Sequence, residues 1–126
     1  MLHERRRQRS EHYPRALRYQ LETVARRLGA QKVVLSGHEG FLILSTHDEA
    51  HDDDIAAMSC KMAQHKNFWS GRYLNKDGQR NLAIQRVETP HGEMFLCAVN
   101  PANRRSMQNE LGHSGQGVAR ILANHF

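Results

Sequence analysis

Apolar positions follow a helical period in the stretch after Pro14. They recur at steps of three and four residues from Leu17 to Leu28, which is the pattern of an amphipathic helix. Pro14 suits the first turn of such a helix, and Gly29 is typical of the position just after a helix ends. The sequence therefore predicts a first helix from Pro14 to Leu28.

Two short apolar runs follow, and both are typical of strands. Residues 33–35 and 41–44 flank a connection that begins at Gly37 and ends at Gly40, which indicates a hairpin. Both runs are apolar at consecutive rather than alternate positions. We therefore expect the sheet to be covered on both faces, on one side by helices and on the other by helices or a partner chain.

An acidic block, residues 47–54, leads into a second helix with apolar positions Ile55, Met58 and Met62. Asp52 or Asp53 is expected to be its N-cap, and the other carboxylates suit the positive end of the helix dipole.

Three strands are expected over residues 70–75, 81–88 and 93–99, with turns at 76–79 and 89–92. Three aromatic side chains at the start of this region are expected to pack in the core or in a dimer, with a ligand-stacking patch as the alternative: Phe68, Trp69 and Tyr73. A last helix begins near Met107. It is expected to be kinked or broken, because three glycines within it weaken a helix: Gly112, Gly115 and Gly117.

The length of 126 residues fits one domain, and the charge is unevenly distributed. Residues 1–18 carry six arginines against two glutamates, whereas the rest of the chain is nearly neutral. We expect residues 1–13 to be a basic, poorly ordered arm and residues 14–126 to be a single domain. The alternative to a solvated arm is binding to an acidic partner, RNA, DNA or an acidic lipid surface, for which the candidate residues are Arg5, Arg6, Arg7 and Arg9.

Cysteine usage and hydropathy indicate a cytoplasmic protein. Cys60 and Cys97 lie in separate apolar segments without a CxxC spacing, so both are expected to be reduced and buried. No apolar run approaches the roughly 20 residues that span a bilayer, so no membrane span is expected.

Candidate chemistry is sparse. His47 and His51, with the neighbouring carboxylates, are the only metal-ligand candidates, and helix initiation explains the same acidic residues. Residues 112–116, GHSGQ, begin like a nucleophile elbow but lack its fifth residue, glycine, and its strand-turn-helix context. We therefore expect no catalytic residue, no cofactor site and no enzyme activity.

The order of expected elements is helix, strand, strand, helix, three strands, helix. With these lengths the chain resembles the roadblock/LC7 family, which includes dynein light chains and the MglB-type partners of Ras-like GTPases. The resemblance covers about residues 15–125 and rests on residues 30–45, AQKVVLSGHEGFLILS, and on the helix start IAAM at 55–58. It implies an α/β (α+β) domain in which a five-stranded antiparallel sheet packs with helices.

The resemblance also implies a non-enzymatic scaffold or regulator. Such a protein forms a homodimer, or pairs with a related roadblock subunit, and binds a small Ras-like GTPase or a related signalling partner. The second helices would pair, and the sheet would continue across the dimer. Because the apolar side of the second helix is expected to face its own sheet, the interface is expected on the other side, at Ala57, Lys61 and Gln64.

Two alternatives remain open from the sequence. A sensory domain of GAF or PAS type predicts an enclosed pocket and a bound small molecule. A nucleic-acid-associated protein acting through the arginine arm predicts binding that weakens steeply with salt.

Overall fold

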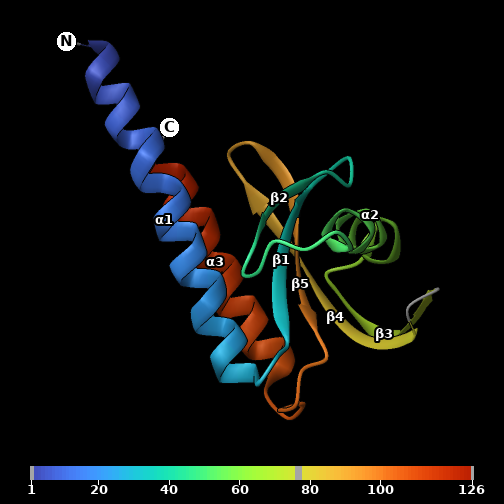
Figure 1. Ribbon diagram of the computed structural model, residues 1–126. Helices are drawn as coiled ribbons and strands as arrows, with labels where there is room; N and C mark the ends of the chain where they lie inside the picture. The colour runs from blue at the N-terminus through green and yellow to red at the C-terminus, as the bar shows by residue number, and fades with distance from the viewer. Residues whose placement is uncertain (1, 76–77, 126) are drawn as a thin grey trace.

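The helices and strands follow one another in the order that the sequence predicts (Figure 1). The computed structural model describes residues 2–75 and 78–125, so Met1, Lys76, Asp77 and Phe126 lie outside it. The elements are α1 (Leu2–Leu28), β1 (Lys32–Gly37), β2 (Leu42–Ser45), α2 (Asp52–Ala63), β3 (Phe68–Asn75), β4 (Gly78–Thr89), β5 (Gly92–Val99) and α3 (Met107–His125).

The strands form one antiparallel sheet in the order β2-β1-β5-β4-β3. The hairpin of β1 and β2 joins the meander of β3, β4 and β5 because β5 pairs with β1, placing Val34 opposite Cys97 and Leu35 opposite Leu96. The connection through α2 therefore carries the chain from one edge of the sheet to the other. As a result β2 and β3 are the two edge strands.

Helices cover both faces of the sheet, as the consecutive apolar runs predict. Helices α1 and α3 lie side by side on one face, and α2 lies on the other (Figure 1). The first face buries four residues of α1 almost completely, and each stabilises the fold by about 1.5–3 kcal/mol relative to an exposed side chain. These residues are Leu17, Leu21, Val24 and Leu28. The second face buries Val34, Ile55, Ile84 and Phe95.

Helix α1 begins earlier than the sequence predicts. It starts at Leu2, and Pro14 lies inside it rather than in its first turn. The preceding stretch is rich in arginine and glutamate, which favour helix, and a proline removes only one backbone hydrogen bond. The helix ends at Leu28, and the φ of +59° at the next residue, Gly29, allows the Ala30 N–H to donate to the Ala25 carbonyl at 2.9 Å. The division of the chain at residue 13 stays a prediction.

Helix α3 is continuous, so the expected kink is wrong. Two of its glycines allow close packing instead. A Cβ at Gly115 would lie 3.0 Å from Cγ2 of Val87 on β4, and a Cβ at Gly117 would lie 2.9 Å from the Gln20 side chain on α1. Tertiary packing against the sheet and α1 thus offsets the low helix propensity of glycine.

Candidate partner-binding surface

Helix α2 presents a buried side to the sheet and an exposed side to solvent. Ile55, Ala56 and Ala63 are fully buried, and Met62 packs at the edge of the same core. Ala57, Lys61 and Gln64 are exposed, at spacings of four and three residues that place them in one stripe. The structure therefore leaves the predicted interface positions accessible. Their role in an interface stays a prediction.

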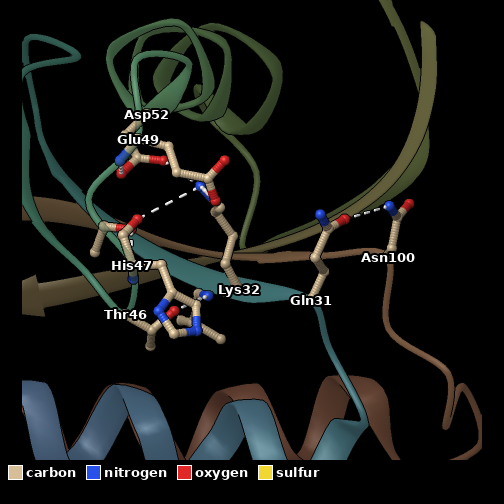
Figure 2. Close-up of polar contacts among 9 residues, drawn as sticks. Gln31, Lys32, Thr46, His47, Glu49, Asp52 and Asn100 are labelled. Carbon is tan, nitrogen blue, oxygen red and sulfur yellow. Dashed lines mark hydrogen bonds and ion pairs between the residues drawn. The ribbon is translucent and has the colours of Figure 1, made fainter. Parts of the chain in front are cut away.

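A buried ion pair holds the start of α2 against β1. Lys32 and Asp52 are 2% and 1% exposed, and Lys32 Nζ donates to Asp52 Oδ1 at 2.6 Å. Figure 2 shows Lys32 reaching from β1 toward both carboxylates, since Glu49 Oε1 also lies 2.8 Å from Nζ. Asp52 Oδ2 accepts the Glu49 N–H at 3.0 Å, so both carboxylate oxygens of Asp52 are occupied. A buried ion pair with these bonds fixes the position of the helix start.

This arrangement corrects the predicted N-cap. The N-cap residue is His51, which makes no side-chain capping bond, and Asp52 is the first residue of the helix. Asp52 bonds Lys32 and the preceding turn, and Asp53 and Asp54 are exposed in the first turn. The acidic first turn still suits the helix dipole, as the sequence predicts.

Burial and the hydrogen bonds from Lys32 shift the pKa values of Asp52 and Glu49. Burial alone would raise the pKa of Asp52, but its hydrogen bonds from Lys32 and from the Glu49 N–H outweigh burial, so the pKa is lowered. The pKa of Glu49 is also lowered, first by the hydrogen bond from Lys32 and then by its charge. Both groups are therefore held ionised in the folded protein.

The turn between β1 and β2 packs on α2. Gly40 has a φ of +85°, and a Cβ there would lie 3.3 Å from the Cα of Ala57. The Cys60 thiol donates to the His38 carbonyl at 3.0 Å. Phe41, which follows Gly40 in this turn, is 69% exposed. A large aromatic side chain thus lies at solvent close to the exposed stripe of α2.

Strand β3 is an edge strand whose aromatic residues lie on opposite faces of the sheet. Trp69 and Tyr73 are partly buried beside the core on the α2 side, whereas Phe68 packs against the core under α1 and α3. All three residues thus pack against the core, as the sequence predicts, but on two faces of the sheet, because successive strand residues point to opposite faces. The Trp69 ring lies over Gly71, where a Cβ would be 2.8 Å from it. Leu74, near the end of the strand, is 73% exposed.

The metal-ligand candidates lie around the start of α2. Among the side chains that the structure describes, residues 14–74 and 78–124, no group of three or more His, Cys, Asp or Glu is arranged to hold a metal ion. His47 is exposed in the loop before α2 and His51 precedes the first residue of the helix. Glu49 and Asp52, the carboxylates between and beside them, bind Lys32 instead.

The remaining sequence candidates are placed as follows. Ser114 of the GHSGQ stretch is buried within α3, where its Oγ lies 3.5 Å from Gln20 Nε2. The stretch is therefore not a nucleophile elbow.

Both cysteines are free. Burial raises the pKa of the Cys97 thiol to about 12. Burial, and after it the charge of Glu93, raises the pKa of the Cys60 thiol. In the described part of the chain no helix is long and apolar enough to cross a membrane.

The arginine arm has a helical backbone, since its residues fall within α1. The side chains of Arg5, Arg6, Arg7 and Arg9 lie outside the described part of the structure. Their contact with an acidic partner stays a prediction.

Sequence reasoning misses Lys32 and Phe41. A single charged residue at the start of an otherwise apolar strand, residues 32–35, is the signal for a buried ion pair. The apolar character of Phe41 predicts a core residue of the strand, but Phe41 precedes the first residue of β2 and lies at the turn.

The element order, the antiparallel sheet and the placement of the helices define the roadblock/LC7 fold. The solved structures to which this chain is similar include MglB proteins. The gliding protein mglB from Thermus thermophilus matches with a TM-score of 0.66 at 14% identity, over 89% of this chain and 92% of that chain.

Two further MglB structures match equally well. An MglB with a tetrameric arrangement has a TM-score of 0.65 at 16% identity, over 90% of this chain and 92% of that one. Myxococcus xanthus MglB has a TM-score of 0.64 at 12% identity, with the same coverage. No protein-family model and no curated protein sequence matches the chain. The likeness at these identities is one of fold.

Proposed function

We propose that this chain is a non-enzymatic regulatory module that forms a dimer through α2 and the outer edge of β3. The observation that carries the proposal is the open edge of β3 beside two half-buried aromatic residues, Trp69 and Tyr73, on the face that α2 covers. An unpaired strand edge offers backbone groups to a second strand, and a two-fold axis would let two copies use the same surface.

The exposed stripe of α2 suits pairing with its own copy. Ala57 is small, so two helices can approach closely at this position. Asp53 and Asp54 are exposed in the first turn, and Lys61 is exposed in the last turn. Two antiparallel α2 helices would bring the acidic start of each helix toward the basic end of the other, which favours this orientation.

The proposed partner of the dimer is a small Ras-like GTPase or a related signalling protein. The roadblock/LC7 resemblance implies such a partner, and the likeness in fold to MglB structures, one of them with a tetrameric arrangement, supports regulation through protein contacts. We also propose a cytoplasmic location, which the two free cysteines support.

Charge placed in the α2 stripe tests the dimer. We expect Ala57→Glu to shift the protein toward monomer by at least about tenfold in dissociation constant, because a carboxylate would enter the centre of the interface, where it is desolvated. Sedimentation velocity over a range of concentrations measures the shift. Ala123→Glu makes the same change at an exposed position of α3 and should leave the dimer intact.

A dimer that persists in Ala57→Glu would show that α2 is not the interface. A dimer lost equally in both variants would indicate a general effect of added charge, and would also count against the proposal.

The GTPase partner is tested separately. Each Ras-like GTPase of the source organism, loaded with GDP or with a non-hydrolysable GTP analogue, is mixed with the full chain and separated by size exclusion. We expect co-elution with at least one GTPase, in a manner that depends on the bound nucleotide. Failure of every GTPase to co-elute would contradict this part of the proposal and leave the dimer untouched.

A further inference from the structure

A polar groove of about 550 Å³ runs between α3 and β4, on the face opposite α2. On the helix side it is lined by Gln108, Asn109, Gly112 and Gln116. On the sheet side it is lined by Asn67, Gln85, Arg86, Val87 and Glu88. Neither the α2 stripe nor the edge residues of β3 line it, so the groove is separate from the proposed dimer interface.

Gln85 supplies an acceptor in this groove. The residue is 6% exposed, and its Nε2 donates to the Asn67 carbonyl at 3.0 Å, to Asn67 Oδ1 at 3.2 Å and to the Arg86 carbonyl at 3.0 Å. These three acceptors fix the orientation of the amide. Within the described residues these bonds all use Nε2, so Oε1 is the acceptor that Gln85 offers to the groove it lines, where a donor from a ligand can reach it.

A short unpaired stretch of strand backbone borders the same groove. The pairing of β3 with β4 begins at Phe68 opposite Gln85, while β4 continues to Thr89. Beyond Gln85, the Arg86 N–H donates to the Asn67 carbonyl at 2.9 Å, on the side away from β5. Because strand residues alternate in direction, the N–H and C=O of Glu88 point to that same side, where no described strand lies. This backbone can pair with an added extended segment.

The charge of the lining selects against a phosphate or carboxylate ligand. Arg86 and Glu88 pair with each other at 3.5 Å, and because strand residues alternate, their side chains point to the opposite face of the sheet from Gln85 and Val87. Apart from His113, the polar side chains that line the groove on the α3 side of the sheet are neutral amides. Amides both donate and accept, which matches a peptide backbone. The groove is also open at Gly112, where an added Cβ would have no atom within 4 Å.

We propose that this groove binds an extended, uncharged polar segment of a partner polypeptide. The segment donates a backbone N–H to Gln85 Oε1 and pairs with the backbone of Glu88, while its side chains lie along the amides of α3. The site does not depend on the dimer formed through α2 and β3.

The test uses a phage-displayed library of short linear peptides, selected against the full chain. The blocking variant is Gly112→Leu, at a lining position where an added Cβ meets no atom within 4 Å, and Ala123→Leu is the control at an exposed position of α3 outside the groove. We expect selected peptides to be polar and uncharged, to bind Gly112→Leu at least about tenfold more weakly, and to bind Ala123→Leu as they bind the parent. Gln116→Trp, at an exposed position lining the same groove, serves as a second blocking variant.

Hydrogen exchange supplies the second measurement. The Glu88 amide should exchange rapidly in the free protein and become protected when a selected peptide binds. The proposal is overturned if the selection enriches no peptide, or if the selected peptides bind the parent protein and the blocking variants with equal affinity. It is also overturned if the selected peptides are acidic and their binding weakens with salt, or if the exchange rate of the Glu88 amide hydrogen is the same with and without peptide.

Discussion

Lys32 illustrates how one residue positions the proposed interface helix. Its ammonium group is buried between β1 and the start of α2, 2.6 Å from Asp52 Oδ1 and 2.8 Å from Glu49 Oε1. Such a pair adds little net stability over an apolar pair of similar size, but the loss of one member leaves a buried charge without compensation. The position of α2 thus depends on the charge of Lys32, which stands at the start of an otherwise mostly apolar strand.

We expect Lys32→Met to lower the free energy of unfolding by about 3–5 kcal/mol, because Asp52 stays buried without its cation. The double variant Lys32→Met with Asp52→Leu should recover most of this loss, since neither charge remains. Urea denaturation of the three proteins measures the effect. A single variant that costs no more than the double variant would show that the pair is not the anchor of α2.

Acid should weaken the same contact. The pKa of Asp52 and that of Glu49 are lowered from their ordinary values of 3.8 and 4.5, so both groups add stability that is fully present above these values. That stability is lost as the pH falls below about 4.5 and through the lower pKa values of the folded state. Thermal melts should therefore show a steeper loss on acidification for the parent than for the double variant without the pair. Equal slopes would contradict this role of the carboxylates.

For single residues, the sequence predicts which side chains are exposed better than it predicts which side chains contact one another. The helical period correctly places Ala57, Lys61 and Gln64 on the exposed side of α2. It cannot predict the contact of Lys32 with Asp52, because the two residues are far apart in sequence and meet only when β1 and α2 pack. The same applies to Gln85, whose partners come from the segment before β3.

At the scale of elements, local patterns predict the order and type of every helix and strand but not all of their limits. The predicted kink of α3 is wrong because helix propensity counts each glycine as a cost, whereas Gly115 and Gly117 are where the helix contacts Val87 and Gln20. The predicted start of α1 is wrong for a related reason. Proline is common in the first turn of a helix, so Pro14 predicts that the helix begins there. The residues before it favour helix as well, and the helix begins at Leu2.

The three glycines of α3 should respond differently to substitution. Gly112→Ala should raise the free energy of unfolding by up to about 1 kcal/mol, because alanine favours helix and its Cβ meets no atom within 4 Å. Gly115→Leu should lower it by about 1–3 kcal/mol, because the side chain would collide with Val87. Chemical denaturation measures both. If Gly112→Ala were destabilising and Gly115→Leu neutral, the close packing of α3 on β4 would be in error.

At the scale of the whole molecule, the sheet leaves β3 as an edge and the helices cover both faces. The consecutive apolar runs predict two covered faces, and this is confirmed. The strand order β2-β1-β5-β4-β3 could not be derived from local patterns, because it depends on β5 pairing with β1 across about half of the chain. This order makes β2 and β3 the two edge strands, and so leaves β3 available to a second copy.

The measurement that tests the central claim most directly is the absolute mass of the full chain in solution, by light scattering on a size-exclusion column at several concentrations. Self-association through α2 and β3 predicts twice the 14.5 kDa of one chain. A mass of one chain at every concentration would contradict the account, because the β3 edge and the α2 stripe would then be ordinary solvent-exposed surface.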